Sequence, residues 1–121
     1  MNWQDNPLAR FVVEQVSASA LIENGRVPFT MLVHFTLLPE AYGSGPALAS
    51  VSQEQSRSES GCLFYTWMQH TERPDRLSLY ERWCNLDALK LHFGTAHFEE
   101  LGRMLQTRIA QDPQIELYAE L

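Results

Sequence analysis

Two histidines in the last third of this chain carry the side chains best suited to acid–base chemistry, because imidazole titrates near neutral pH. His97 falls on the apolar side of a helix predicted after Thr95, where a histidine is either a hydrogen-bonded core group or a general acid or base. His92 lies on the short segment before that helix and can reach the same cavity. We take both as candidate catalytic residues. A third histidine, His34, lies in the middle of a predicted strand and is a candidate substrate-binding residue.

A glutamate within a predicted β-strand is the third candidate catalytic residue. Glu81 lies between Tyr80 and Arg82 in the sequence. A half-buried carboxylate at such a place is either a structural acid paired with Arg82 or Arg76, or a base whose pKa is raised by burial. The sequence leaves both interpretations open.

Aromatic residues gather on the same side of a predicted hairpin as Glu81. The alternation of side chains along two strands joined by the turn at 72–75 places one set on each face. One face carries Leu63, Tyr65, Trp67, Leu79, Glu81 and Trp83, and the other carries Cys62, Phe64, Thr66, Met68, Tyr80 and Arg82. Flat rings either fill a core or line a slot for a planar ligand. The candidate substrate-binding residues are therefore Tyr65, Trp67, Trp83, His34 and Phe98, the last from the final helix.

The pattern of potential ligands argues against a metal site and a bound nucleotide. His92 and His97 are five residues apart with Gly94 between them, so they do not lie on one helical face as ligands at i and i+4 would. The sequence has no GxGxxG, GxxxxGK[ST] or GxSxG motif. We expect no metal and no cofactor.

Composition narrows the class of partner. The net charge is −6, and the nine lysines and arginines are scattered, which disfavours nucleic acid and anionic membranes as partners. No apolar run approaches the ~20 residues that span a bilayer, and the N-terminus does not resemble a secretory signal. The two cysteines, Cys62 and Cys84, form no CxxC motif and suit reduced thiols. We expect a cytoplasmic protein.

The elements that must position these residues are predicted to alternate between strands and helices. Strands are expected at 29–38, 62–70, 77–84 and 114–120, and helices at 44–60, 86–93 and 96–112, the first of them ending at Gly61 in left-handed geometry. This order is that of the split βαβ arrangement, so we predict an α+β, ferredoxin-like domain with a four-stranded antiparallel sheet. Because both faces of the hairpin carry large apolar groups, we expect the second face to be covered by another copy of the chain in a homodimer.

The first 27 residues read differently from the rest. A helix capped by Asp5 or Asn6 and begun by Pro7 is one interpretation, and a strand is the other. The domain prediction is an N-terminal extension over 1–27, either an arm that packs on a partner subunit or a mobile tail, followed by a single domain over 28–121.

Three motifs in this order resemble the antibiotic biosynthesis monooxygenase family. They are GCLFY at 61–65, LYERW at 79–83 and LKLHFGTAHF at 89–98. The resemblance covers about 29–118. It implies a dimeric α/β barrel with a pocket between each sheet and its helices.

The resemblance also implies an activity. Members oxidise quinols and anthrone-like polyphenols with molecular oxygen and need no metal, flavin or haem, because the substrate is itself the reductant. A base removes a proton, the electron-rich anion reacts with oxygen, and the protein orients and stabilises it. We therefore expect a cofactor-independent monooxygenase whose partners are a small hydroxylated aromatic and oxygen. The alternatives are an isomerase of the same fold, or a non-catalytic dimeric module that binds small molecules or serves a stress response.

Overall fold

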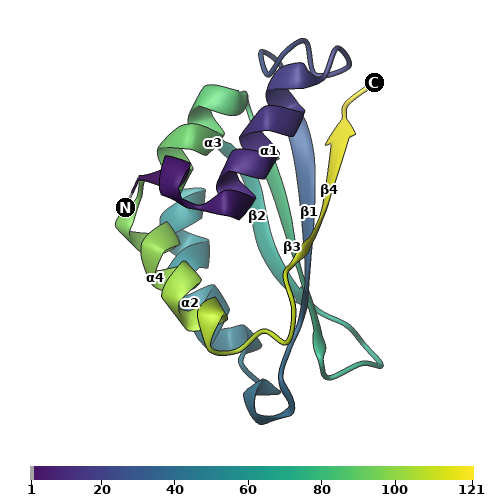
Figure 1. The fold of residues 1–121 in the computed structure, drawn as a ribbon, viewed down its shortest axis with the longest axis vertical. Coiled ribbons are helices and arrows are strands. Elements are labelled where there is room, and N and C mark those ends of the chain that lie inside the picture. Colours follow the sequence, from purple (N-terminus) through teal and green to yellow (C-terminus); the bar gives the residue numbers. More distant parts are fainter. Residues whose placement is uncertain (1) are drawn as a thin grey trace.

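The computed structural model describes residues 2–121, which form one sheet with helices on one side of it (Figure 1). The strands are β1 (Phe29–Thr36), β2 (Cys62–Gln69), β3 (Arg76–Trp83) and β4 (Gln114–Ala119). The α-helices are α1 (Pro7–Ala18), α2 (Gly45–Arg57), α3 (Leu86–Phe93) and α4 (Ala96–Gln106), and short 3-10 helices occur at Trp3–Asp5 and Pro39–Ala41.

The sheet has the predicted antiparallel topology, with strand order β2-β3-β1-β4. β1 is central, pairing with β3 on one side and β4 on the other. Along β1 and β3 every second residue is buried, because one face of the sheet packs on the helices and the other has no covering layer in a single chain. The ferredoxin-like α+β fold expected from the sequence is confirmed.

The β2–β3 hairpin has the expected register over most of its length. Tyr65 lies opposite Glu81 and Trp67 opposite Leu79. A bulge between Cys62 and Phe64 shifts the register at the start of β2, because an extra residue there reverses the alternation of side chains. The prediction that Leu63 shares a face with Tyr65 and Trp67 was therefore wrong. Leu63 is 44% exposed, and Cys62 takes the position opposite Trp83.

The helices begin where side chains cap them. Asn85 and Thr95 accept hydrogen bonds from the backbone N–H groups of Ala88 and Phe98, which fixes the starts of α3 and α4 as expected. Their adjacent ends bring His92 and His97 onto neighbouring turns of two helices.

The predicted left-handed end of α2 at Gly61 was wrong, since α2 ends at Arg57 and only Gly25 and Gly43 among the described glycines have positive φ. Gly61 is required for space instead. A Cβ there would meet the Cβ of Ala88 at 2.3 Å. The absence of a side chain thus lets α3 approach the start of β2.

The N-terminal segment forms a helix that belongs to the core. Asn6 caps α1, accepting hydrogen bonds from the N–H groups of Leu8 and Ala9, and Pro7 begins the helix. Val12 and Val16 are buried in the same cluster as the sheet and α3. α1 lies in the helix layer beside α3 and in front of the sheet (Figure 1). No helix within residues 2–121 is long and apolar enough to cross a membrane.

Candidate functional site: a cavity between the sheet and its helices

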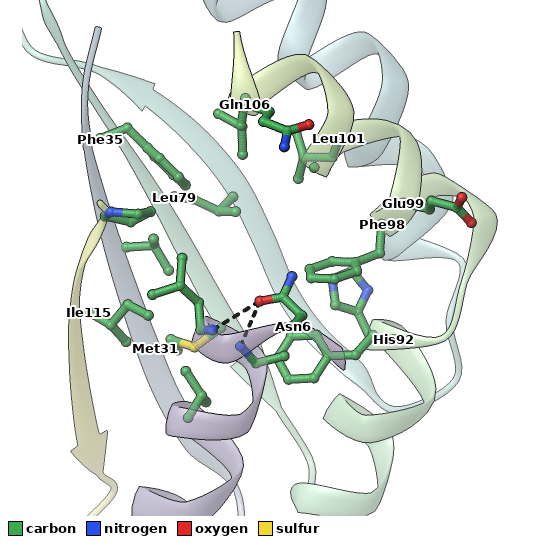
Figure 2. A pocket seen from close by; sticks show the side chains of 18 of the residues that line it. Asn6, Met31, Phe35, Leu79, His92, Phe98, Glu99, Leu101, Gln106 and Ile115 are labelled. Carbon is green, nitrogen blue, oxygen red and sulfur yellow. Dashed lines mark hydrogen bonds between the residues drawn. The ribbon is translucent and has the colours of Figure 1, made fainter. Parts of the chain in front are cut away.

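A cavity of about 600 Å³ lies between the sheet and the helix layer (Figure 2). This is the size typical of a site for a small organic ligand. Its walls are mainly apolar and come from every layer of the fold. The strands contribute Met31, Val33, Phe35, Tyr65, Leu79 and Ile115, and the helices contribute Leu8, Ala9, Val12, Phe93, Phe98 and Leu101.

Two ionisable side chains in this wall are buried, Glu81 from β3 and His92 from α3. The carboxylate Oε1 of Glu81 accepts a hydrogen bond of 3.0 Å from the indole Nε1 of Trp83. Burial raises the pKa of Glu81 to about 8, an effect that the indole donor opposes and does not overcome. At neutral pH Glu81 is therefore mainly a neutral acid with a proton to donate.

The structure decides between the two interpretations of Glu81. Arg82 lies on the opposite face of the sheet and pairs with Glu120. The alternative of a structural acid paired with that arginine was wrong, because neighbouring residues of a strand point to opposite faces. Burial favours the interpretation with a raised pKa, but a carboxyl group with a pKa of about 8 is an acid at neutral pH and not the base that the sequence offered.

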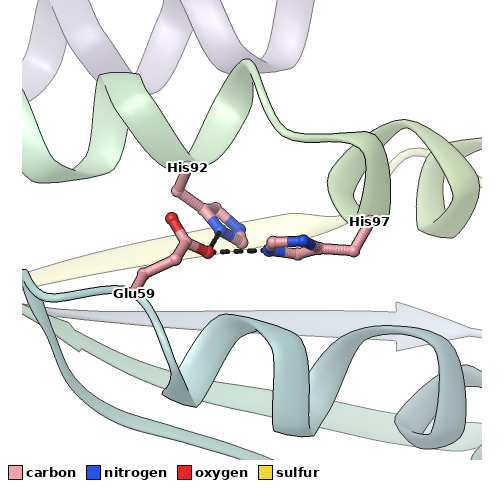
Figure 3. Close-up of side chains that lie close together, drawn as sticks. All are labelled: Glu59, His92 and His97. Atoms are coloured by element: carbon pink, nitrogen blue, oxygen red, sulfur yellow. Dashed lines mark hydrogen bonds and ion pairs between the residues drawn. The ribbon is translucent and has the colours of Figure 1, made fainter.

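His92 is held in place by a carboxylate from a distant part of the chain. Its Nδ1 lies 2.7 Å from Oε2 of Glu59, in the turn after α2, and Nε2 of His97 lies 2.7 Å from the same oxygen (Figure 3). Burial alone would raise the pKa of Glu59, but its hydrogen bonds and charge interactions with both histidines lower it below the usual value. Glu59 is therefore a carboxylate that accepts hydrogen bonds.

The hydrogen bond to Glu59 fixes the tautomer of His92. Burial lowers the pKa of His92, so the ring is neutral at pH 7 and carries one proton. That proton lies on Nδ1, because the acceptor Glu59 carries none. The lone pair is then on Nε2, which makes no hydrogen bond to any described residue. Glu81 and His92 thus give one cavity a neutral acid and a neutral base.

The aromatic residues predicted for the site divide into three groups. Tyr65 and Phe98 line the cavity. Trp83 is fully buried behind it, with its ring 4.6 Å from that of His92 and its N–H on Glu81, so it supports both groups. Trp67 packs against Phe35 and donates its N–H to Ser52, away from the cavity.

The ring of Tyr65 forms part of the cavity wall, but its hydroxyl group does not serve as a base. Burial, followed by the charge of Glu81, raises its pKa well above the usual value. Its hydroxyl lies near those of Ser52 and Ser56, yet it forms no hydrogen bond of good geometry to a described residue.

Two of the predicted histidines lie outside the cavity wall. His97 contacts the cavity only through Glu59 and His92. His34 is on the open face of the sheet, where Nδ1 meets the hydroxyl of Ser78 and Nε2 lies 2.6 Å from Glu116. The alternation along β1 places His34 on the face opposite Met31 and Val33.

Glu59, the residue that organises this site, was not predicted from the sequence. Glu59 lies in a turn, 33 positions before His92, and no local pattern links the two. The role of the N-terminal residues was also left undecided, and in the structure Asn6, Leu8 and Val12 line the cavity, Asn6 being labelled in Figure 2. The Asn6-Pro7 start of a helix was the available signal, although it did not reveal where the helix packs.

Comparison with known proteins agrees with this architecture. Residues 28–103, more than half of the chain, match the sequence profile of the family described as antibiotic biosynthesis monooxygenase. The chain belongs to the antibiotic biosynthesis monooxygenase family. An uncharacterized protein of Synechocystis sp. is 25% identical over 108 residues, which cover 89% of this chain and 74% of that protein.

Solved structures show the same fold. A crystal structure of an antibiotic biosynthesis monooxygenase has a TM-score of 0.70 at 25% identity, covering 77% of this chain and 98% of the other. A protein of Pseudomonas aeruginosa has a TM-score of 0.65 at 28% identity, and the match covers 78% of this chain and 95% of that protein. A Mycobacterium tuberculosis protein has a TM-score of 0.71 at 23% identity, and the match covers 78% of this chain and 95% of that protein. Family membership supports a monooxygenase-like enzyme that acts on a small molecule.

Proposed function

We propose that this protein is a cofactor-independent monooxygenase that oxidises a small hydroxylated aromatic, such as a quinol or an anthrone, with molecular oxygen. The observation that carries the proposal is the presence of a buried neutral acid, Glu81, and a buried neutral base, His92, in the wall of a mainly apolar cavity. Membership of the family supplies the reaction class.

The cavity suits a flat, uncharged substrate. Its volume of about 600 Å³ and its lining of aliphatic and aromatic side chains favour a planar ring system over a charged metabolite. Burying a charged ligand deep in the cavity would be costly, because the buried wall residues Glu81 and His92 are neutral and wall residues such as Arg103 are exposed.

The proposed chemistry uses the lone pair of His92 and the proton of Glu81. Nε2 of His92 accepts a proton from the phenol or the activated C–H group, and the carboxylic acid of Glu81 donates a hydrogen bond to the oxyanion that forms. The substrate anion supplies the electrons that reduce oxygen. For an anthrone, the CH2 group becomes C=O, one oxygen atom entering the substrate and the other leaving as water with both hydrogens. No external reductant is needed.

The remaining residues of the site position these two groups. Glu59 fixes the tautomer of His92, and His97 shares the Glu59 oxygen. Trp83 contacts both His92 and Glu81 and holds their orientation. Tyr65 and Phe98 provide ring surface for the substrate.

The test is oxygen uptake by chelator-treated protein over a panel of quinols and anthrones, with heat-denatured protein as the blank. We expect uptake above autoxidation, and we expect His92→Ala to lower kcat/KM by at least about 100-fold, the usual scale for loss of a general base. The matched control is His70→Ala, since His70 lies in the exposed turn after β2 and should tolerate the change. Thermal stabilisation by these compounds without oxygen uptake would instead favour a binding module.

A further inference from the structure

Three potential metal ligands from separate segments converge beside the cavity. They are Glu59 from the turn after α2, His92 from the last turn of α3 and His97 from the first turn of α4 (Figure 3). Their ligand atoms all lie within 4.8 Å of one another. We propose that this trio is a binding site for one divalent transition-metal ion, of which zinc is the probe.

The residue types fit such an ion. Two imidazole nitrogens and one carboxylate oxygen are a donor set that zinc and its neighbours in the first transition series accept, with water completing the coordination. Around an ion with bonds of about 2.1 Å, ligand atoms in tetrahedral positions lie ~3.4 Å apart. The two N–O distances of 2.7 Å therefore need to open by roughly 0.7 Å, which small side-chain rotations supply.

A metal needs deprotonated ligand atoms. The atoms that would bind the ion are the same ones that now share hydrogen bonds, the Glu59 oxygen with one nitrogen from each histidine. An ion would replace the shared hydrogen-bonding protons between the three groups. The ring proton of His92 then moves to Nε2, so the metal-bound form would lack the Nε2 lone pair that the proposed oxygenase reaction uses.

The surroundings of the three ligands let a metal ion enter but limit the access of water to them. His92 is almost fully buried, while the side chains of Glu59 and His97 are each 17% exposed. An ion can thus arrive from the side of Glu59 and His97 and keep a water ligand there. His92 forms the inner wall against Trp83 and Phe98.

No metal was expected because His92 and His97 do not lie on one helical face, but the structure brings them together from two helices and adds Glu59 as a third ligand. A second histidine–carboxylate pair, His34 with Glu116, has no third such ligand among the described residues. That pair is a control built into the same molecule. Two ligands alone should bind zinc only weakly.

The experiment is calorimetric titration of zinc into untagged, metal-free protein with Cys62→Ser and Cys84→Ser, because the two free thiols would otherwise compete. We expect one equivalent bound with a dissociation constant in the micromolar range or tighter. His97→Ala and Glu59→Gln should each weaken binding at least tenfold, and His34→Ala should leave it unchanged. Zinc should also raise the melting temperature of the parent and not that of His97→Ala.

A second measurement on the parent protein tests the site even if the variants fold poorly. Cobalt(II) added to the parent protein should give the visible absorption of a low-coordinate site, and zinc should displace it. Equal zinc affinity in the parent and in folded His97→Ala, or no binding by the parent at 1:1 stoichiometry, would overturn the proposal and leave a hydrogen-bonded trio. None of these readouts needs a substrate, so the result is independent of whether the protein is an oxygenase.

Discussion

At the scale of single residues, the chemistry of this site arises from burial acting on two groups in opposite ways. Burial raises the pKa of Glu81 and lowers that of His92, because in each case the charged form is the one that loses its hydration. Both groups are consequently neutral at pH 7, one with a proton to give and one with a lone pair. In water at pH 7 the same glutamate would be fully charged and the same histidine about one-quarter protonated.

Glu81 should make the stability of the fold depend on pH in a defined direction. Its pKa is about 8 in the folded protein and near 4.5 when the chain is unfolded, so between these values unfolding releases a proton. Stability from this group is complete below about pH 4.5 and is lost as the pH rises towards 8. The Glu81→Gln variant cannot lose stability in this way. We therefore expect its free energy of unfolding, minus that of the parent, to increase by about 3 kcal/mol or more from pH 5 to pH 8, given about 1.4 kcal/mol per pKa unit.

Urea unfolding of both proteins at several pH values measures this difference. Comparing the two cancels the opposite contributions of Glu59 and His92, whose pKa values are lowered in the folded state. Parallel pH profiles for the parent and Glu81→Gln would show that Glu81 titrates normally and that the neutral-acid role is incorrect.

The position of a single side chain could be predicted where it followed from the alternation of side chains along a strand. Tyr65 and Glu81 were predicted to share one face because successive strand residues point to opposite faces, and the structure pairs them on one face, which proves to be the covered one. Glu59 was out of reach, since only the tertiary packing of the turn after α2 against α3 and α4 brings it to His92. His34 was ambiguous because a single strand sequence does not say which face is covered.

At the scale of elements, the contact between the start of β2 and α3 depends on a missing side chain. A Cβ on Gly61 would lie 2.3 Å from that of Ala88, far inside van der Waals contact. We expect Gly61→Ala to destabilise the fold by about 1–3 kcal/mol, the usual cost of overpacking. Ala88→Gly should recover much of that loss in the double variant, as measured by denaturant unfolding of all four proteins. Additive effects of the two changes would mean that the contact is not limiting.

The N-terminal helix adds a wall to the cavity that lies outside the residues matched to the family. Leu8 lines the cavity, whereas Phe11 on the other side of α1 is 47% exposed. We expect Leu8→Trp to narrow the cavity and to lower kcat/KM for a tricyclic anthrone by about tenfold or more, with little change for a monocyclic quinol. Phe11→Trp is the matched control. Equal effects on the large and the small substrate would show that α1 does not select by size.

The errors at this scale have local physical causes. The order of strands and helices followed from turn residues and hydrophobic spacing, and it was predicted correctly. The bulge after Cys62 was not visible in the sequence, because it depends on how β2 pairs with β3. Gly61 was assigned a conformational role from its position after a helix, while its actual role depends on Ala88 in a later element.

At the scale of the whole molecule, the two faces of the sheet differ in what covers them. The helix-covered face holds the cavity, and the other face carries large side chains with no covering layer in a single chain. Phe64, Met68 and Tyr118 on that face are each at least 40% exposed. Exposed apolar groups that share one face are typical of an interaction surface. We propose that a second copy of this chain covers it, as the family resemblance implies.

Charged residues placed on the open face should therefore separate the proposed dimer. We expect the parent to elute with twice the mass of the chain in size-exclusion chromatography with light scattering at micromolar concentration. Phe64→Glu with Met68→Glu should elute as a monomer, because burying two uncompensated carboxylates in an apolar interface is unfavourable. Leu91→Glu is the control, since Leu91 is 74% exposed on α3 and lies on the helix side of the sheet. A monomeric parent, or dissociation by Leu91→Glu alone, would contradict an interface on the open face and require another surface for self-association.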